Sequence, residues 1–363
     1  MDTAPQIPVI EYDALRSGAP GVGEAIVEGF GRFGLVYISG HPLDLGEVLR
    51  LYDSFLEVLQ RPEREKATWG GPQIWFQRGW TPPNTERAVL ARGRPDFKEC
   101  FFAAPEPLDP RCQAAWPEIY ADNVWPDDAA EFTERTLAVG HSLHAVGIWL
   151  LRACEIALDL GPEEMVGLSR GGAHLTRLLK YLPLTSEQAA RRPRVLWGEE
   201  HTDFNVLTLL PGGCFYRDRA RGRPRERGGL YLRTRPTPEH PSGRRVGGQP
   251  PEGCLVAQVG QQLEVLSGGR FLATPHGIVA PSEPGWTRTS LAHFVHLNGR
   301  SRVEPLGPVE QPGAYGPPVL AGTYATKTLV DIGLAPPSVL GQLGYRHYDR
   351  LSGMRALEAS EPS

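Results

Sequence analysis

A histidine and an aspartate two positions apart, His201 and Asp203, are the residues whose types and spacing best suit chemistry. They open a mostly strand-like stretch, and residues two apart in a strand point to the same face, so an imidazole and a carboxylate should project together. His276 stands in a second strand-like stretch and is the expected third ligand. Two histidines and one carboxylate on one face of an octahedron leave three positions open, a ligand set typical of non-haem Fe(II). Taken alone, a His-x-Asp pair is more often a surface or turn feature.

An arginine and a serine downstream of His276 strengthen the metal hypothesis. Arg288 and Ser290 again share one face of a predicted strand. A guanidinium can hold a carboxylate by two parallel hydrogen bonds, and a hydroxyl adds a third. An arginine that points into a barrel needs an anion there, because an unpaired buried charge is costly. The sequence therefore offers a metal site followed by an anion-binding pair.

Together these residues resemble the signature of the isopenicillin N synthase-like family of Fe(II)- and 2-oxoglutarate-dependent oxygenases. The resemblance covers most of the chain, with further similar segments at residues 7–10, 29–41, 78–82 and 97–101. It implies a mostly β protein with flanking helices, in which an N-terminal α/β segment precedes a double-stranded β-helix, or jelly-roll, core.

The resemblance also implies the cofactors and the reaction. Fe(II) would bind His201, Asp203 and His276, and the far carboxylate of 2-oxoglutarate would pair with Arg288 and Ser290. With O2, such an enzyme oxidises a small organic molecule, by default through hydroxylation, and releases succinate and CO2. One alternative is an oxidase of the isopenicillin N synthase type, which performs oxidative cyclisation without 2-oxoglutarate and holds substrate carboxylate with the Arg-x-Ser pair. A second alternative is a catalytically silent binding barrel.

Two further segments supply candidate binding residues. The stretch 173–183 resembles a family strand that ends in two aromatics and a proline, but Leu182 replaces one aromatic, so Tyr181 remains as a possible contact of 2-oxoglutarate. In relatives, segments such as 68–96 help to cover the mouth of the site. The candidate substrate-binding residues there are Gln73, Trp75, Phe76 and Arg78, although aromatic packing under a loop explains each of them equally well.

Four regions follow from the pattern: an N-terminal non-haem dioxygenase region at 5–125, helical support at 126–172, the dioxygenase core at 173–300, and a C-terminal lid and tail at 301–363. Helical spacing of apolar residues predicts helices over 44–67 and 128–160. Residues 256–269 resemble a strand-turn-strand unit that leads to His276. The arginine-rich tract 217–227 and the Pro/Gly-rich segment 236–252 are expected to be barrel insertions, which cost little stability. The loops at 68–96, 213–227 and 236–252 are expected to define the substrate.

Other histidines are expected to be structural. His141 and His144 lie three apart in the predicted helix at 128–160, and no carboxylate partner appears in that frame. His293 and His296 follow Ser290, and residues three apart on a strand face opposite sides, so both cannot be ligands.

Composition bounds the remaining possibilities. The chain has 363 residues, 40% of them hydrophobic, which suffices for one large barrel with added helices or for two domains. A net charge of −4 gives no electrostatic case for nucleic acid, and no apolar run reaches the roughly 18 residues of a membrane span. The N-terminus lacks a secretory pattern, and five cysteines without a Cys-x-x-Cys pair favour reduced thiols in the cytoplasm. A small-molecule partner is expected, whereas substrate identity and oligomeric state do not follow from the sequence.

Overall fold

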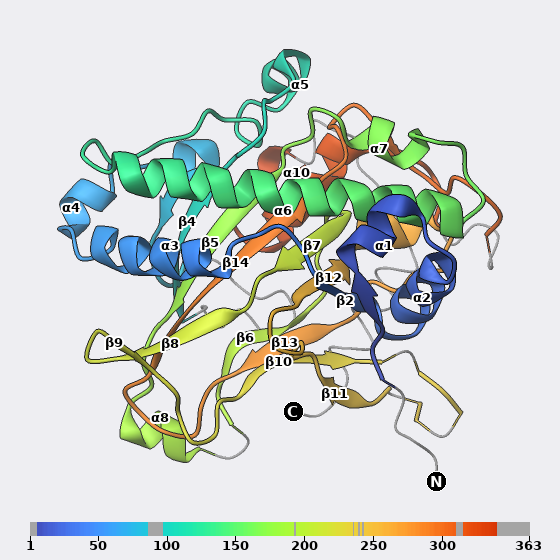
Figure 1. Ribbon diagram of the computed structural model, residues 1–363. Helices are drawn as coiled ribbons and strands as arrows, with labels where there is room; N and C mark the ends of the chain where they lie inside the picture. Colours follow the sequence, from blue (N-terminus) through green and yellow to red (C-terminus); the bar gives the residue numbers. More distant parts are fainter. Residues whose placement is uncertain are drawn as a thin grey trace, which may run out of the picture.

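Two facing β-sheets form the centre of the molecule, and helices cover the outer face of the larger one (Figure 1). This double-stranded β-helix with flanking helices confirms the predicted fold class. The computed structural model describes residues 6–85, 97–191, 194–234, 236–238, 240–241, 243–309 and 315–339.

The larger sheet has ten strands and is mostly antiparallel. Its main path runs β1 (Val9–Glu11), β2 (Leu35–Ser39), β12 (Leu255–Val259), β7 (Leu207–Leu210), β14 (Thr287–Val295), β5 (Leu175–Tyr181), β4 (Lys98–Ala103) and β3 (Gly79–Thr81), with β8 (Gly213–Arg217) beside β14 and β9 (Ala220–Gly222) beside β8. The smaller sheet runs β11 (Arg245–Gly247), β10 (Gly229–Arg233), β13 (His276–Val279) and β6 (Leu196–His201). A short pair, β15 (Arg302–Val303) and β16 (Val319–Leu320), lies apart from both sheets.

The helix α6 (Ala130–Ala157) spans the larger sheet (Figure 1). Gly147 allows the close approach, since a Cβ there would stand 2.8 Å from a methyl group of Val295 on β14. By length and composition α6 could cross a membrane, but half of its most apolar window is buried in the fold. The other α-helices are α1 (Tyr12–Ser17), α2 (Val22–Glu28), α3 (Leu45–Val58), α4 (Glu63–Lys66), α5 (Pro110–Ala115), α7 (Glu164–Ser169), α8 (Ser186–Ala190), α9 (Gln261–Leu266) and α10 (Ala321–Asp331).

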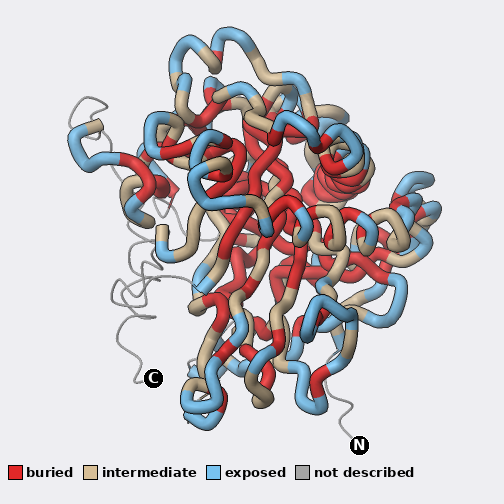
Figure 2. Tube along the Cα trace, turned by 90° about the vertical axis from the view of Figure 1, so that its left-hand side faces the viewer, coloured by how far each residue is buried: buried red, intermediate tan, exposed pale blue. Residues whose placement is uncertain are grey.

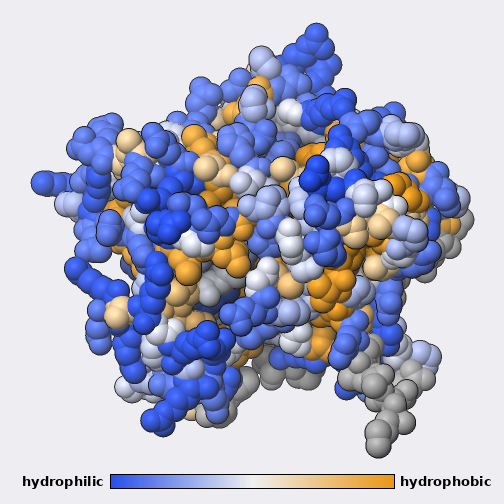
Figure 3. All heavy atoms as spheres, in the orientation of Figure 1, coloured by the Kyte–Doolittle hydropathy of each residue, from blue (hydrophilic) through white to orange (hydrophobic). Residues whose placement is uncertain are grey.

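Strand alternation separates two cores on either side of β14. Leu291 and Val295 point outward into the cluster beneath α6, whereas Ala292 and Phe294 point inward. The inward cluster joins the two sheets, because it combines Tyr181 of the larger sheet with residues of the smaller sheet. Figure 2 shows the buried residues gathered along the strands at the centre. Figure 3 shows mainly hydrophilic side chains on the face seen in Figure 1.

The segment predicted as one helix over 44–67 is two helices. Helix α3 ends at Val58, and α4 begins at Glu63, immediately after Pro62. Proline lacks the N–H that a continuous helix would need, so it starts the second helix instead of extending the first.

The strand-turn-strand prediction for 256–269 was wrong in its second half. After β12 the chain forms the helix α9, whose residues are all buried. The Glu264 carboxylate on α9 accepts a hydrogen bond of 2.8 Å from the backbone N–H of Ala273, which fixes the approach to His276. The arginine-rich tract is also partly regular: β8 and β9 form a hairpin, and Arg221 pairs with Asp53 on α3.

Candidate active site

Two neighbouring strands bring the predicted histidines together. His201 is the last residue of β6, His276 is the first residue of β13, and the antiparallel register places them opposite each other. Their ring centroids are 4.5 Å apart. The side chain of His201 is 47% exposed and that of His276 only 9%, so the pair is reachable from one side.

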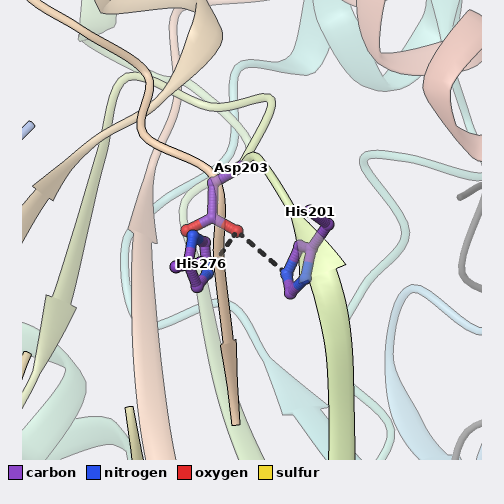
Figure 4. A group of neighbouring side chains, drawn as sticks. All are labelled: His201, Asp203 and His276. Carbon is purple, nitrogen blue, oxygen red and sulfur yellow. Dashed lines mark ion pairs between the residues drawn. The ribbon is translucent and has the colours of Figure 1, made fainter. Parts of the chain in front are cut away.

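Asp203 completes the group, although it does so differently from the predicted strand alternation. It lies beyond the end of β6, in the loop before β7, where its carbonyl accepts a hydrogen bond of 2.7 Å from the N–H of Gln261. Its Oδ1 is 3.6 Å from Nε2 of His201 and 3.8 Å from Nε2 of His276 (Figure 4). The three ligand atoms lie within 4.8 Å of one another. This loop therefore places the carboxylate between the two imidazoles.

Backbone carbonyls orient both imidazoles. Nδ1 of His201 lies 2.7 Å from the Glu199 carbonyl, and Nδ1 of His276 lies 3.2 Å from the Thr274 carbonyl. A carbonyl only accepts, so each Nδ1 carries the proton and each Nε2 keeps a free lone pair. This is the tautomer that a metal requires of a histidine bound through Nε2.

Polar side chains support the carboxylate and the buried imidazole. The Thr208 hydroxyl donates to Oδ2 of Asp203 at 2.6 Å, which leaves Oδ1 available. The Gln258 amide lies 2.5 Å from Nδ1 of His276, and its Oε1 has no hydrogen-bond partner among the described residues. Amide oxygen and nitrogen can exchange places by a half-turn, so Gln258 can offer Oε1 to the Nδ1–H of His276.

The electrostatics favour the protonation states that bind metal. Burial lowers the pKa of His276 to about 4, against the opposing effect of the Asp203 carboxylate. Burial raises the pKa of Asp203, but His276, His201 and the Thr208 hydrogen bond together outweigh it, and the net pKa is lowered. At neutral pH the buried imidazole is neutral and the carboxylate is ionised. Two nitrogen donors and one oxygen donor with an open side fit Fe(II).

The predicted anion-binding pair lies on the inner face of the larger sheet. A guanidinium N–H of Arg288 donates to the Ser290 hydroxyl at 3.1 Å, and the guanidinium carbon lies 5.5 Å from the centroid of the Tyr181 ring. No carboxylate in the described ranges is within ion-pair distance of Arg288. Tyr181 in turn stacks on Trp197, which precedes His201 on β6. These residues fit a co-substrate that carries a carboxylate.

A cavity opens beside His201 and Asp203. Its walls include Arg78, Ile119, Phe102, Phe204, His296 and the α10 residue Leu329. Of the four candidate substrate-binding residues, Arg78 lines the cavity. Trp75 and Phe76 pack in the hydrophobic cluster behind its wall, and Gln73 is exposed.

Helix α10 lies in the segment expected to be the C-terminal lid, and its residues Ala325, Thr328 and Leu329 line the cavity. His293 and His296 lie on opposite sides, as strand alternation predicted, because His293 contacts His144 on α6 whereas His296 lines the cavity. His296 was expected to be only structural, and its place in the cavity wall was not predicted. Among the described residues, the segments 213–227 and 236–252, expected to shape the pocket, contribute none to the cavity wall.

Comparison with known families agrees with this geometry. Residues 7–128 match the model described as the non-haem dioxygenase in morphine synthesis N-terminal region, and residues 174–297 match the 2OG-Fe(II) oxygenase superfamily. The chain belongs to this oxygenase superfamily. It is a 2-oxoglutarate-dependent dioxygenase that uses Fe(II) and 2-oxoglutarate, as the resemblance implied.

The relatives of this oxygenase have low sequence identity to it, but they align with most of the chain. It is 26% identical over 277 residues to the 2-oxoglutarate-dependent dioxygenase ecdK of Aspergillus rugulosus, covering 71% of this chain and 75% of that protein. It is 25% identical over 291 residues to leucoanthocyanidin dioxygenase 1 of Oryza sativa, covering 77% and 68%. The crystal structure of a full-length Neurospora crassa protein in complex with alpha-KG superposes with a TM-score of 0.71 at 22% identity, over 89% of this chain and 96% of that one, and shares the fold.

Proposed function

We propose that this oxygenase hydroxylates a small organic molecule, with iron held by His201, Asp203 and His276. The convergence of the three ligand atoms beside a cavity carries the proposal. Both Nε2 lone pairs are fixed by their Nδ1–H bonds, and Oδ1 of Asp203 is the free carboxylate oxygen. Three protein ligands on one side leave room on the other side for a co-substrate and O2.

Arg288 would hold the far carboxylate of 2-oxoglutarate, with the Ser290 hydroxyl as an additional donor. The Tyr181 ring faces the guanidinium and restricts its orientation. Around this pair the inward core is apolar and aromatic, including Trp197 and Phe215. A charge-assisted hydrogen bond is stronger in such surroundings than in water.

The cavity beside the metal ligands would hold the substrate. When bound, iron and 2-oxoglutarate activate O2 and supply the oxidising power, with succinate and CO2 as products. The protein contributes by placing one C–H bond of the substrate next to the metal and by excluding water from it. The apolar cavity wall formed by Phe102, Phe204 and Leu329 suits both tasks.

An anaerobic titration tests the proposal. Fe(II) and then 2-oxoglutarate are added to metal-free protein, and the weak visible charge-transfer band of an iron-chelated keto acid is recorded. We expect the band in the wild type. Arg288→Ala should require about 100-fold more 2-oxoglutarate, because a charge-assisted bidentate bond is lost.

The exposed Arg300 provides the matched control, and Arg300→Ala should leave the requirement unchanged. An unchanged requirement in Arg288→Ala would assign this arginine to the substrate instead. Iron binding without any band would favour an oxidase that takes all of its electrons from the substrate, and O2 consumption would then be measured.

A further inference from the structure

One charged side chain of the cavity wall lies outside the proposed iron and 2-oxoglutarate sites. Arg78 immediately precedes β3 and is 1% exposed, yet it lines the same cavity as His201 and Asp203. Burial lowers the pKa of Arg78 only to about 10, so the guanidinium keeps its charge at neutral pH. The cavity therefore contains a permanent buried cation.

The hydrogen bonds of Arg78 leave part of the guanidinium unused. One terminal nitrogen donates to the Gln77 carbonyl at 2.7 Å, and the other donates to the Ile119 carbonyl at 3.3 Å. Among the described residues, Nε has no hydrogen-bond partner and no carboxylate lies within ion-pair distance. A guanidinium has five N–H donors, so donors remain for a ligand.

Two partly buried arginines outside the cavity wall are neutralised by the chain itself. Arg233 pairs with Glu200 at 2.9 Å, and Arg135 pairs with Glu47 at 3.2 Å. Leaving a buried charge unpaired is costly. The Asp122 carboxylate attracts Arg78 only from beyond ion-pair distance. Arg78 lies in the cavity wall, where an incoming anion can supply the closer partner.

The rest of the cavity indicates what kind of molecule carries that anion. Arg177 and Lys98 add two further cations to its wall, and of its two acidic residues, Asp203 is the proposed iron ligand and Glu199 is the other. The ring of His296 lies near Arg78, whose charge reinforces the effect of burial in lowering the histidine pKa to about 3. Ile119, Phe204 and the α10 residues Ala325 and Leu329 make the remaining wall apolar.

We propose that Arg78 binds a carboxylate of the substrate, so that this oxygenase acts on a small organic acid with an apolar body. The inference rests on the proposed function, because it places the substrate in the cavity beside the iron ligands. The carboxylate would meet Arg78 while the apolar body packs against α10 and Phe204. Binding the charged end in this way would fix which carbon faces the metal.

Matched pairs of acids and amides test this assignment. Protein saturated with Fe(II) and 2-oxoglutarate is titrated anaerobically at constant ionic strength with phenylacetate or phenylacetamide, and with cyclohexanecarboxylate or its amide. The shift of the charge-transfer band gives each dissociation constant, and saturation with 2-oxoglutarate keeps the acids away from Arg288. In the wild type we expect at least one acid to bind about 10-fold more tightly than its amide.

Variants then show which residue causes the tighter binding of the acid. Arg78→Gln should bring the acid-to-amide ratio close to one, whereas Arg78→Lys should keep part of it because the positive charge remains. Arg300→Gln, at an exposed position, should leave the ratio as in the wild type.

The outcomes separate this inference from the proposed function. A wild-type band with no preference for either acid, including no binding of any probe, overturns the inference and leaves the proposed function standing. A preference that survives in Arg78→Gln also overturns it and points to Arg177 or Lys98. Absence of the band in the wild type contradicts the proposed function itself. Because the wild-type ratio needs no variant, the test holds even if Arg78→Gln fails to fold.

Discussion

The histidines at the mouth of the barrel and those between α6 and the larger sheet are packed with similar closeness but differ in what they can bind. In the second group, the ring centroid of His144 is 4.2 Å from that of His174 and 5.5 Å from that of His293. Their nitrogens are largely committed to the protein. Nδ1 of His174 accepts the N–H of His296, and the two nitrogens of His293 face the Thr176 hydroxyl and His144.

The first group differs by its carboxylate and by its free lone pairs. Both Nε2 atoms, on His201 and His276, face Oδ1 of Asp203, while the nearest acidic partner of the second region, Glu106, is bound to His141 at the surface. Burial lowers the pKa values of His174 and His293 well below the ordinary range, so that group is a neutral packing cluster. Histidines that lie close together are thus not sufficient for a metal site. Each imidazole must also keep one nitrogen lone pair free, as Nε2 does when Nδ1–H is bound to a carbonyl.

The largest expected effect separates the two groups directly. Asp203→Ala should abolish Fe(II) binding at stoichiometric metal and reduce succinate release to background, because the anionic ligand is lost. His144→Gln should retain one iron per chain and its activity. Metal content after desalting, measured together with succinate release, checks both variants. Iron retained by Asp203→Ala but lost in His144→Gln would reverse the comparison.

A smaller effect is expected from the residues that orient each group. Gln258→Leu removes the side-chain partner of His276 Nδ1, and loss of such a partner typically weakens metal affinity by about 10- to 100-fold. Thr176→Val removes the partner of His293 and should lower the free energy of unfolding by about 1–3 kcal/mol without changing metal affinity. Competition with a metal-binding dye and urea unfolding measure the two quantities. Equal metal affinities in wild type and Gln258→Leu would refute the orienting role.

The smallest effect concerns acid stability. The folded-state pKa of His293 is depressed, so the unfolded chain takes up a proton below pH about 6.5 while the folded chain does not. Its contribution to stability is complete above that pH and is lost as the pH falls. His144, His296 and His141 add to the depression.

His293→Gln should therefore flatten the decline in unfolding free energy between pH 7 and pH 5 by up to about 1.4 kcal/mol per pH unit. Urea unfolding of both proteins in metal-free buffer tests this, since contributions from other groups cancel in the difference. If the unfolding free energies of the two proteins depend on pH in the same way, the pKa of His293 does not change on unfolding, and the prediction is contradicted.

Much of the fold and part of the site could be predicted because they depend on local periodicity. Alternation placed Arg288 and Ser290 on one face of a strand, and their side chains are in contact. It also predicted that Asp203 projects beside His201, which it does, although Asp203 lies beyond the end of β6. It did not reveal that His296, beyond the end of β14, lines the cavity. Where a strand ends is decided by its partners across the sheet, and a single sequence does not reveal those partners.

The cavity wall could be predicted only in part, for a different reason. Arg78 was one of four candidates in its segment, and packing of the whole chain separated it from Gln73 on the surface. The resemblance implied a C-terminal lid, but no local pattern shows which α10 residues pack against segments some two hundred positions earlier, as Leu329 does in the cluster that contains Ile119. Residues that bind iron carry a recognisable chemistry, whereas those that shape a pocket share the apolar character of any core.

The position of α10 also has a consequence for how the enzyme is made and how it can change. During synthesis this helix leaves the ribosome after both strands that carry the histidine ligands, so the last wall of the pocket is made after the metal ligands. The two parts of the site are therefore separable in time and in mutation. Substitutions on the inner face of α10 can change which substrate binds, while the iron ligands and the reaction with O2 stay the same.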